Sequence, residues 1–151
     1  MPVIQHSQFI HAPIDKCFDL ARNVDVHTKT TAKTKEKAVG GVTQGLLKEG
    51  DTVTWEATHF AVRQKLTAKV IYMKKPHEFV DVMVKGAFHS FTHHHQFSEE
   101  QDGTIMTDRF EYKSPFGLIG SIADKLFLEK YMREFIISRA NELKKVAETE
   151  K

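Results

Sequence analysis

The sequence predicts one α+β domain in which a long C-terminal helix packs against a curved antiparallel sheet. Residues 36–113 alternate between apolar and polar side chains in short runs separated by turn signals, which is typical of strands. Residues 116–148 carry a broad apolar stripe at helical spacing, and such a stripe must be buried on one face of the sheet. A length of 151 residues suits a single domain covering residues 1–151.

The N-terminal part is expected to add one strand and at least one helix. Residues 2–11 alternate well enough for a strand, and Pro13 suits the first position of a helix. The polar, threonine-rich residues 23–35 form either a short second helix or a loop. Between these segments, apolar residues at helical spacing predict a short amphipathic helix: Ile14, Cys17, Phe18 and Ala21.

The middle of the chain contains six runs with strand character. With the N-terminal strand they give a sheet of six to seven strands, interrupted by a glycine-rich loop over residues 40–51. The runs cover residues 36–39, 52–60, 63–72, 78–85, 91–99 and 104–113.

The last two runs are predicted to form a hairpin closed by the four-residue loop Glu100-Gln101-Asp102-Gly103. This register places the apolar residues of both strands on one face and leaves a polar face for water, an agreement that supports it. The expected pairs on the apolar face are Phe97 with Met106, His95 with Asp108, His93 with Phe110, and Phe91 with Tyr112.

The long helix has a start signal as well as a stripe. Ser121 and Asp124 resemble a capping box, in which two side chains satisfy the free amides at a helix N-terminus. The stripe includes Leu126, Tyr131 and Phe135, which we expect to cover the sheet.

The composition limits the classes of partner and the location that we expect for this protein. The net charge is only +2, so no broad basic surface for nucleic acid is expected. The apolar stretches are too short for stable membrane insertion, and the N-terminus lacks a secretory pattern. The chain has a single cysteine, Cys17, which cannot form an internal disulfide. These features predict a cytoplasmic protein, and they leave the oligomeric state open.

Several segments together resemble a known superfamily. They are FIHAPIDKCFDLARN (9–23), EKAVGGVTQG (36–45), VTWEATHF (53–60), KGAFHSFTHHHQF (85–97), GTIMTDRFEYKSPFGLIG (103–120) and KLFLEKYM (125–132). With the element order, they resemble the START/Bet v 1-like superfamily, also called SRPBCC or polyketide cyclase/dehydrase-like. The nearest likeness is to small bacterial single-domain members.

The resemblance implies the helix-grip fold, with a cavity between the sheet and the C-terminal helix. Members of the superfamily bind lipids, sterols, hormones or polyketides, and some catalyse cyclisation or dehydration. Because they share no single catalytic signature, the resemblance assigns no catalytic residue to this chain.

Strand parity predicts the wall of such a cavity. The inward positions are apolar with a few polar groups, which is the usual composition of a small-molecule site, so we expect a hydrophobic or amphipathic ligand (lipid, polyketide or aromatic). The alternative is that these side chains simply fill a core. The expected wall is Trp55, His59, Gln64, Leu66, Phe91, His93, His95, Met106, Asp108, Phe110 and Tyr112, covered by Leu126 and Tyr131.

Polar residues on this wall are the candidates for chemistry. His95 opposite Asp108 would place an imidazole beside a buried carboxylate, and with His93 this pair could act in acid–base catalysis of a cyclase or dehydratase type. A structural pair that satisfies its own charges is the interpretation we favour.

His93 and His95 share one face and could supply two metal ligands, with Asp108 or His59 as a third. We nevertheless expect neither a metal nor a cofactor. Asp81 lies on a strand whose two faces are both apolar enough to be internal, so its direction stays open.

Overall fold

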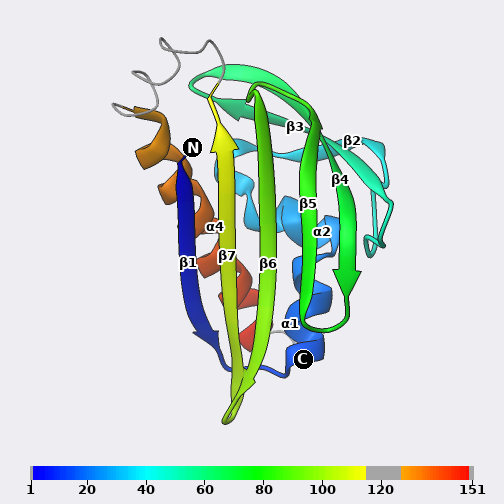
Figure 1. Cartoon of the computed structure of the whole chain (residues 1–151), viewed down its shortest axis with the longest axis vertical. Coiled ribbons are helices and arrows are strands. Elements are labelled where there is room, and N and C mark those ends of the chain that lie inside the picture. The colour runs from blue at the N-terminus through cyan, green and yellow to red at the C-terminus, as the bar shows by residue number, and fades with distance from the viewer. Residues whose placement is uncertain (1, 115–126, 150–151) are drawn as a thin grey trace.

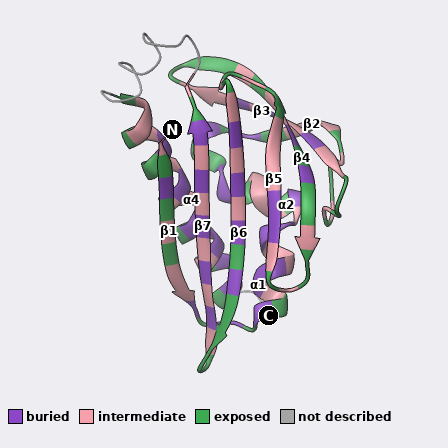
Figure 2. Ribbon diagram, viewed as in Figure 1, coloured by how far each residue is buried: buried purple, intermediate pink, exposed green. Residues whose placement is uncertain are grey.

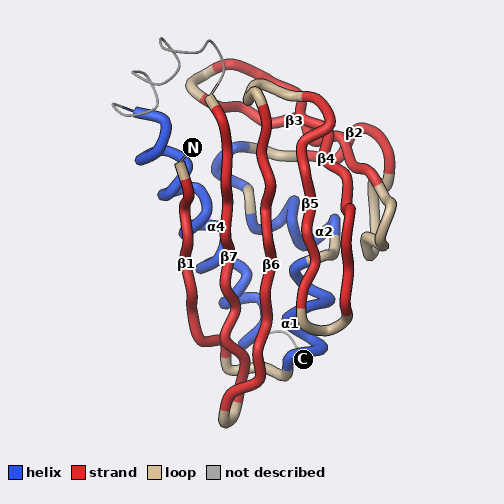
Figure 3. The backbone as a smooth tube through the Cα atoms, viewed as in Figure 1, coloured by secondary structure: helices blue, strands red, loops and turns tan. Residues whose placement is uncertain are grey.

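Seven strands form one antiparallel sheet in the computed structural model, which describes residues 2–114 and 127–149 (Figure 1). Their order is β1-β7-β6-β5-β4-β3-β2, so the first strand of the chain pairs with the last. The strands are Val3–Ile10 (β1), Lys37–Gly41 (β2), Thr52–His59 (β3), Val62–Lys74 (β4), Glu78–Lys85 (β5), Ser90–Glu100 (β6) and Gly103–Lys113 (β7). All helices lie on one face of this sheet (Figure 3).

The segment left open between helix and loop is helical. Helix α1 (Ile14–Ala21) is followed by α2 (Val24–Thr30) and a 3-10 turn, η1 (Ala32–Thr34). The Asn23 side chain accepts hydrogen bonds from the backbone amides of Asp25 and Val26, which caps the N-terminus of α2. A cap of this kind allows a polar sequence with little apolar periodicity to form a helix.

Helix α4 (Glu129–Thr149) is the described part of the predicted long helix. The expected beginning of that helix, with Ser121, Asp124 and Leu126, lies outside the described residues. Within the described ranges, none of the helices combines the length and apolar composition that crossing a bilayer would require.

The β6–β7 hairpin has the predicted register, and its loop is shorter than predicted. His95 pairs with Asp108 and Phe97 with Met106, but Glu100 also pairs with Gly103. Only Gln101 and Asp102 therefore form the turn, and the prediction of a four-residue loop was wrong. Gly103 continues the strand where a Cβ atom would come within 2.4 Å of the Ile10 carbonyl oxygen, a spacing that only glycine tolerates.

The core between the sheet and the helices divides into two larger clusters. Alternating burial along β6 and β7 marks the face that the helices cover (Figure 2). One cluster joins α1 and the C-terminal half of α4 to the sheet, and it contains Cys17, Phe18, Phe79, Phe97, Met106, Ala140 and Leu143. The other joins the N-terminal half of α4 to the sheet, and it contains Ile4, Ala68, Phe91, Phe110, Tyr112, Met132 and Ile136.

Hydrogen bonds fix the C-terminal half of α4 to the edge strand β1. The Lys144 ammonium donates to the Phe9 carbonyl at 2.7 Å, and the Gln8 amide donates to the Ala140 carbonyl at 2.7 Å. Together with the first cluster, these bonds hold one end of the helix tightly on the sheet.

We predict that Leu143→Ala destabilises the protein by about 2–5 kcal/mol, because it removes a fully packed side chain from the interface between α4 and the sheet. Urea unfolding followed by circular dichroism measures the change. Lys145→Ala is the matched control, since its side chain is 71% exposed and its loss should cost under about 0.5 kcal/mol. Equal effects of the two substitutions would contradict the assigned packing of α4.

Candidate functional site

A cavity of about 290 Å³ lies between the sheet and α4. Its walls come from strands β3 to β7 and from α2, and α4 covers it. Large aromatic side chains make up about a third of the residues that line it: Trp55, Phe60, Phe88, Phe91, Phe110, Tyr131 and Phe135. The cavity is thus a concave apolar site of the kind that binds small molecules.

The structure brings most of the predicted wall residues to this cavity. Those that line it are Trp55, His59, Gln64, Leu66, Phe91, His93, Phe110 and Tyr131. Met106, Asp108 and Tyr112 do not line it, because Met106 and Tyr112 pack within the two core clusters and Asp108 is covered by its contacts with His93 and His95. Alternation along a strand predicts which face of the sheet a side chain lies on. It does not predict at which point along the strand the helix is far enough from the sheet to leave a cavity. Leu126 falls outside the described residues.

A second chamber of about 60 Å³ adjoins the cavity on the side of α1 and α2. His95 lines this inner chamber rather than the main cavity. A polar group of a ligand placed between the two spaces would face both of them. The two spaces share six wall residues: His27, Trp55, Ala68, Asp81, His93 and Arg139.

Two histidines and two aspartates form a continuous hydrogen-bonded chain at these walls: His93, Asp108, His95 and Asp81. The Nε2 atom of His93 lies 2.9 Å from Oδ1 of Asp108, and the Nδ1 atom of His95 lies 3.4 Å from the same oxygen. The Nε2 atom of His95 lies 2.8 Å from Oδ1 of Asp81. His95 is therefore held between two carboxylates, and Asp81, whose direction the sequence left open, points inward and makes the shorter contact.

Ring stacking fixes the orientation of His95. Its imidazole lies between the ring of Phe79, with centroids 4.1 Å apart, and the ring of His93, with centroids 3.8 Å apart. The chain is thus rigid as well as buried, because the rings cannot rotate without losing both the stacking and the hydrogen bonds.

The surroundings give the two imidazoles opposite preferences for a proton. Burial acts to lower the pKa of His95, but the charge of Asp81 and the hydrogen bonds to Asp108 and Asp81 outweigh it and raise this pKa. Burial and the charge of His95 lower the pKa of His93. We therefore describe the chain near neutral pH as a charged His95 beside a neutral His93.

The carboxylates of the chain stay ionised. Burial acts to raise the pKa of Asp108, but hydrogen bonds from His93 and His95 outweigh it and place this pKa well below its usual range. For Asp81, burial likewise acts to raise the pKa, and the charge of His95 lowers it overall. Each buried negative charge therefore has an imidazole partner, as burial requires.

Donor atoms of Asp81, His93 and His95 lie within 4.8 Å of one another and could in principle surround a metal ion. The stacked rings oppose this use, because the nitrogen lone pairs of parallel imidazoles do not converge on one point. Both ring nitrogens of His95 also already face carboxylate oxygens. The geometry favours a hydrogen-bonded chain.

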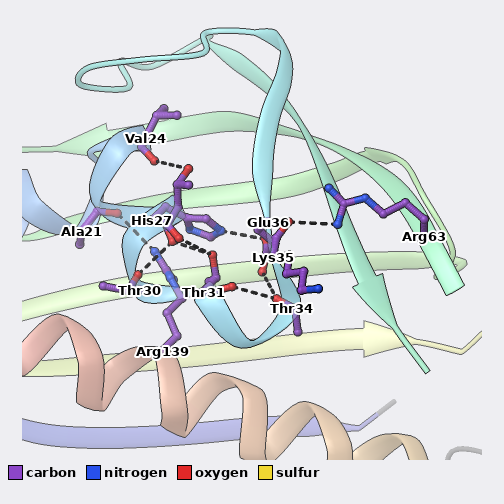
Figure 4. Close-up of polar contacts among 11 residues, drawn as sticks. Ala21, Val24, His27, Thr30, Thr31, Thr34, Lys35, Glu36, Arg63 and Arg139 are labelled. Atoms are coloured by element: carbon purple, nitrogen blue, oxygen red, sulfur yellow. Dashed lines mark hydrogen bonds and ion pairs between the residues drawn. The ribbon is translucent and has the colours of Figure 1, made fainter. Parts of the chain in front are cut away.

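A second buried pair, His27 and Glu36, was not indicated by the sequence. It joins α2 to the residue that precedes β2. The Nε2 atom of His27 lies 3.0 Å from Oε1 of Glu36, and the Thr34 hydroxyl donates to Oε2 of Glu36 at 3.1 Å (Figure 4). The His27 ring stacks on Trp55 with centroids 4.0 Å apart. No spacing motif links these residues, and only the unusual glutamate at the start of an apolar strand could have drawn attention to them.

The electrostatics of this pair follow from burial. Burial lowers the pKa of His27, and the nearby charge of Arg139 acts in the same direction. Burial acts to raise the pKa of Glu36, but the charge of His27 and hydrogen bonds from His27 and Thr34 lower it overall. Glu36 is therefore an ionised carboxylate at the polar end of the cavity.

Another polar contact of the cavity wall joins the β3–β4 turn to α4 through His59 and Tyr131. Nδ1 of His59 lies 2.6 Å from the Tyr131 hydroxyl, and the ring of Phe60 lies on that of Tyr131 with centroids 4.4 Å apart. Phe60 is 59% exposed, so this aromatic cluster borders solvent and forms a rim of the cavity.

We predict that Asp81→Asn lowers the pKa of His95 and destabilises the fold most at low pH. A raised pKa in the folded state stabilises fully below about 6.5, the ordinary histidine value, and this contribution is lost as the pH rises through the folded-state pKa. The destabilisation should therefore shrink as the pH rises from about 6 through the folded-state pKa of His95, down to a constant part from the lost hydrogen bond. Urea unfolding over this range and NMR titration of the His95 ring measure both effects.

Glu78→Gln is the control for Asp81→Asn. Glu78 is on the same strand, and its carboxylate lies 3.6 Å from His94 on the outer face of the sheet. Its removal should have a small effect at every pH. A loss of stability in Asp81→Asn that grows with pH would contradict the assignment of a protonated His95.

Comparisons with known proteins agree on the architecture. No family model and no curated protein matches the sequence. Among solved structures, the chain is similar to TTHA0849 from Thermus thermophilus, with a TM-score of 0.78, 16% identity and 95% of each chain covered. It is also similar to the KanY protein (TM-score 0.73, 16% identity, 97% of each chain) and to major latex-like protein 151 from Panax ginseng (TM-score 0.71, 12% identity, 97% of each chain).

These similarities span nearly the whole of both chains, at identities that support the fold alone. The Bet v 1-like structure Ara h 8.0201 matches as well, with a TM-score of 0.60, 12% identity, and 94% of this chain and 97% of that chain covered. The seven-stranded sheet, the short helices after β1 and the long C-terminal helix confirm the predicted architecture. The chain therefore has the helix-grip fold of the START/Bet v 1-like superfamily.

Proposed function

We propose that this protein binds a compact hydrophobic or amphipathic molecule in the cavity between the sheet and α4. The observation that carries the proposal is an aromatic wall that encloses empty volume and ends at a cluster of buried polar side chains. A core that served stability alone would be close-packed at this point. An apolar site with a few fixed polar groups selects a ligand by both shape and orientation.

The volume of the cavity limits the ligand. About 290 Å³ is at the lower end of the range for small-molecule sites, about 300–1,000 Å³. Aromatic side chains favour offset-stacked or edge-on contacts with other rings. The best match is therefore a flat molecule of two or three fused rings rather than a large lipid.

Trp55 supplies a reporter for binding, because it is the only tryptophan and lines the cavity. We expect 2-ethylnaphthalene to quench or shift its fluorescence and to raise the melting temperature. Native mass spectrometry of the purified protein provides an independent search for a bound compound. Absence of binding by naphthalene-sized, polyketide and lipid probes alike would contradict the proposal.

We predict that Ala57→Phe weakens binding of 2-ethylnaphthalene at least about tenfold, an effect of about 1.4 kcal/mol. Ala57 lines the cavity and belongs to none of the packed clusters, so the added ring would occupy empty volume. Titration of Trp55 fluorescence measures the change. Lys69→Phe adds the same ring on the exposed face of β4 and should leave binding unchanged. Unaltered binding in Ala57→Phe would place the ligand elsewhere.

A second candidate function is acid–base catalysis of the cyclase or dehydratase type on a ligand in this cavity. The observation that favours it is the neutral His93, which lines the cavity while Asp108 holds its Nε2 atom. A hydrogen on Nε2 would leave Nδ1 with a lone pair that could take a proton from a carbon next to a carbonyl group. His95 and Asp108 would hold His93 in that form.

Hydrogen–deuterium exchange at the methyl group of 2-acetylnaphthalene, followed by NMR in deuterated water, tests this second function. If it is correct, the protein accelerates exchange, and His93→Gln and Asp108→Asn each reduce the acceleration about 100-fold or more. His94→Gln, on the outer face of the same strand, should not change it. If His93→Gln and Asp108→Asn leave the exchange rate unaltered, catalysis by the hydrogen-bonded chain of histidines and aspartates is excluded.

A further inference from the structure

Arg139 occupies the point at which three hollows of the molecule meet. Besides the main cavity and the inner chamber, a groove of about 480 Å³ runs between η1 and α4 on the outside. Of the described residues, Arg139 alone lines all three spaces. Its side chain extends from α4 toward Ala21 and the His27–Glu36 pair (Figure 4).

The guanidinium group of Arg139 has few hydrogen-bond acceptors for a largely buried cation. Its one hydrogen bond within the described chain runs from Nη2 to the Ala21 carbonyl and is long, at 3.4 Å. Its Nε atom is buried and has no acceptor among the described residues. A buried cation with so few acceptors is costly, and a ligand oxygen that accepted from the guanidinium group would offset part of that cost.

The charges around Arg139 decide which acceptor fits. Glu36, Asp81 and Asp108 are three ionised carboxylates, and within the described part of the chain the cations that face them are Arg139 and the protonated His95. The polar end therefore already carries a net negative charge, and it is more negative still if His95 loses its proton.

The other nearby cations do not alter this balance. Arg22 lines the inner chamber but is paired with Asp19 at 2.8 Å. Lys65 is exposed at the rim. A ligand carboxylate next to Arg139 would thus meet the charges of Glu36 and Asp81 in an enclosed, poorly solvated space, where like charges repel strongly.

From this arrangement we infer that Arg139 selects, within the proposed binding function, ligands that carry a neutral oxygen acceptor such as a ketone carbonyl on a flat apolar body. The guanidinium group of Arg139 donates to this oxygen between the cavity and the inner chamber. The rings lie against Trp55 and the aromatic wall. Ligands without an acceptor bind more weakly, and carboxylates of the same shape bind most weakly.

Three probes of nearly the same shape test the inference: 2-acetylnaphthalene, 2-ethylnaphthalene and 2-naphthoate. We expect the ketone to bind roughly ten- to a hundredfold more tightly than the ethyl compound, as for a hydrogen bond to a charged group. The carboxylate should bind more weakly than either. Dissociation constants come from Trp55 fluorescence and calorimetry on the full chain at one pH and salt concentration.

Arg139→Met retains the length and packing of the side chain and removes its donors. The ketone and the ethyl compound should then bind equally, while the affinity for the ethyl compound stays within about threefold of the wild-type value. Arg133→Met is the matched control, because Arg133 is on the same helix, is 46% exposed and pairs, among the described residues, with Glu129. It should retain the full preference for the ketone.

The outcomes separate this inference from the proposed function. If all three probes bind with equal affinity, or if the carboxylate binds most tightly, the role of Arg139 is refuted while ligand binding stands. If none binds, the inference fails, and the proposed function fails with it when the polyketide and lipid probes do not bind either. Should Arg139→Met not fold, the ranking of the three probes on the wild-type protein still decides the question.

Discussion

The burial of Asp108 on the concave face of the sheet is the constraint on which the polar end of the site depends. An ionised carboxylate without water needs partners, and here both come from the adjacent strand, since His95 is directly opposite Asp108 and His93 lies two residues further along on the same face. One of those partners is in turn held by Asp81 on the next strand. Three neighbouring strands are thereby linked through their side chains as well as their backbones, and the positions of four polar groups become fixed.

The cavity exists because α4 is held to the sheet more closely at one end than at the other. Small and branched side chains near its C-terminus, together with hydrogen bonds to β1, leave no space there. Toward its N-terminus, α4 presents Tyr131 and Phe135, whose rings hold the helix away from the strands and enclose volume. The same helix therefore provides both the stability of the fold and the cover of the site, which is the division of roles that the helix-grip architecture permits.

Much of the fold could be predicted because its signals are local. Alternation gave the strands and their inward faces, and the hairpin register followed from matching parity, so that His95 was correctly placed opposite Asp108. Alternation does not predict in which direction a side chain turns once it lies on the inward face of the sheet. The shorter contact of His95 is with Asp81, which depends on the lateral packing of three strands and on stacking against Phe79. The His27–Glu36 pair was missed because its residues follow no spacing motif, and Arg139 was missed because it joins segments distant in sequence.

The central claim, that the space beneath α4 is a ligand site with an oriented polar end, is tested most directly by locating a bound probe. Crystals grown with 6-bromo-2-acetylnaphthalene would allow the bromine atom to be placed by its anomalous scattering. We expect one strong peak within the aromatic wall between the sheet and α4, with the carbonyl oxygen of the probe beside Arg139. A probe found only in the outer groove, or a cavity closed by repacked side chains with no probe inside, would contradict the account.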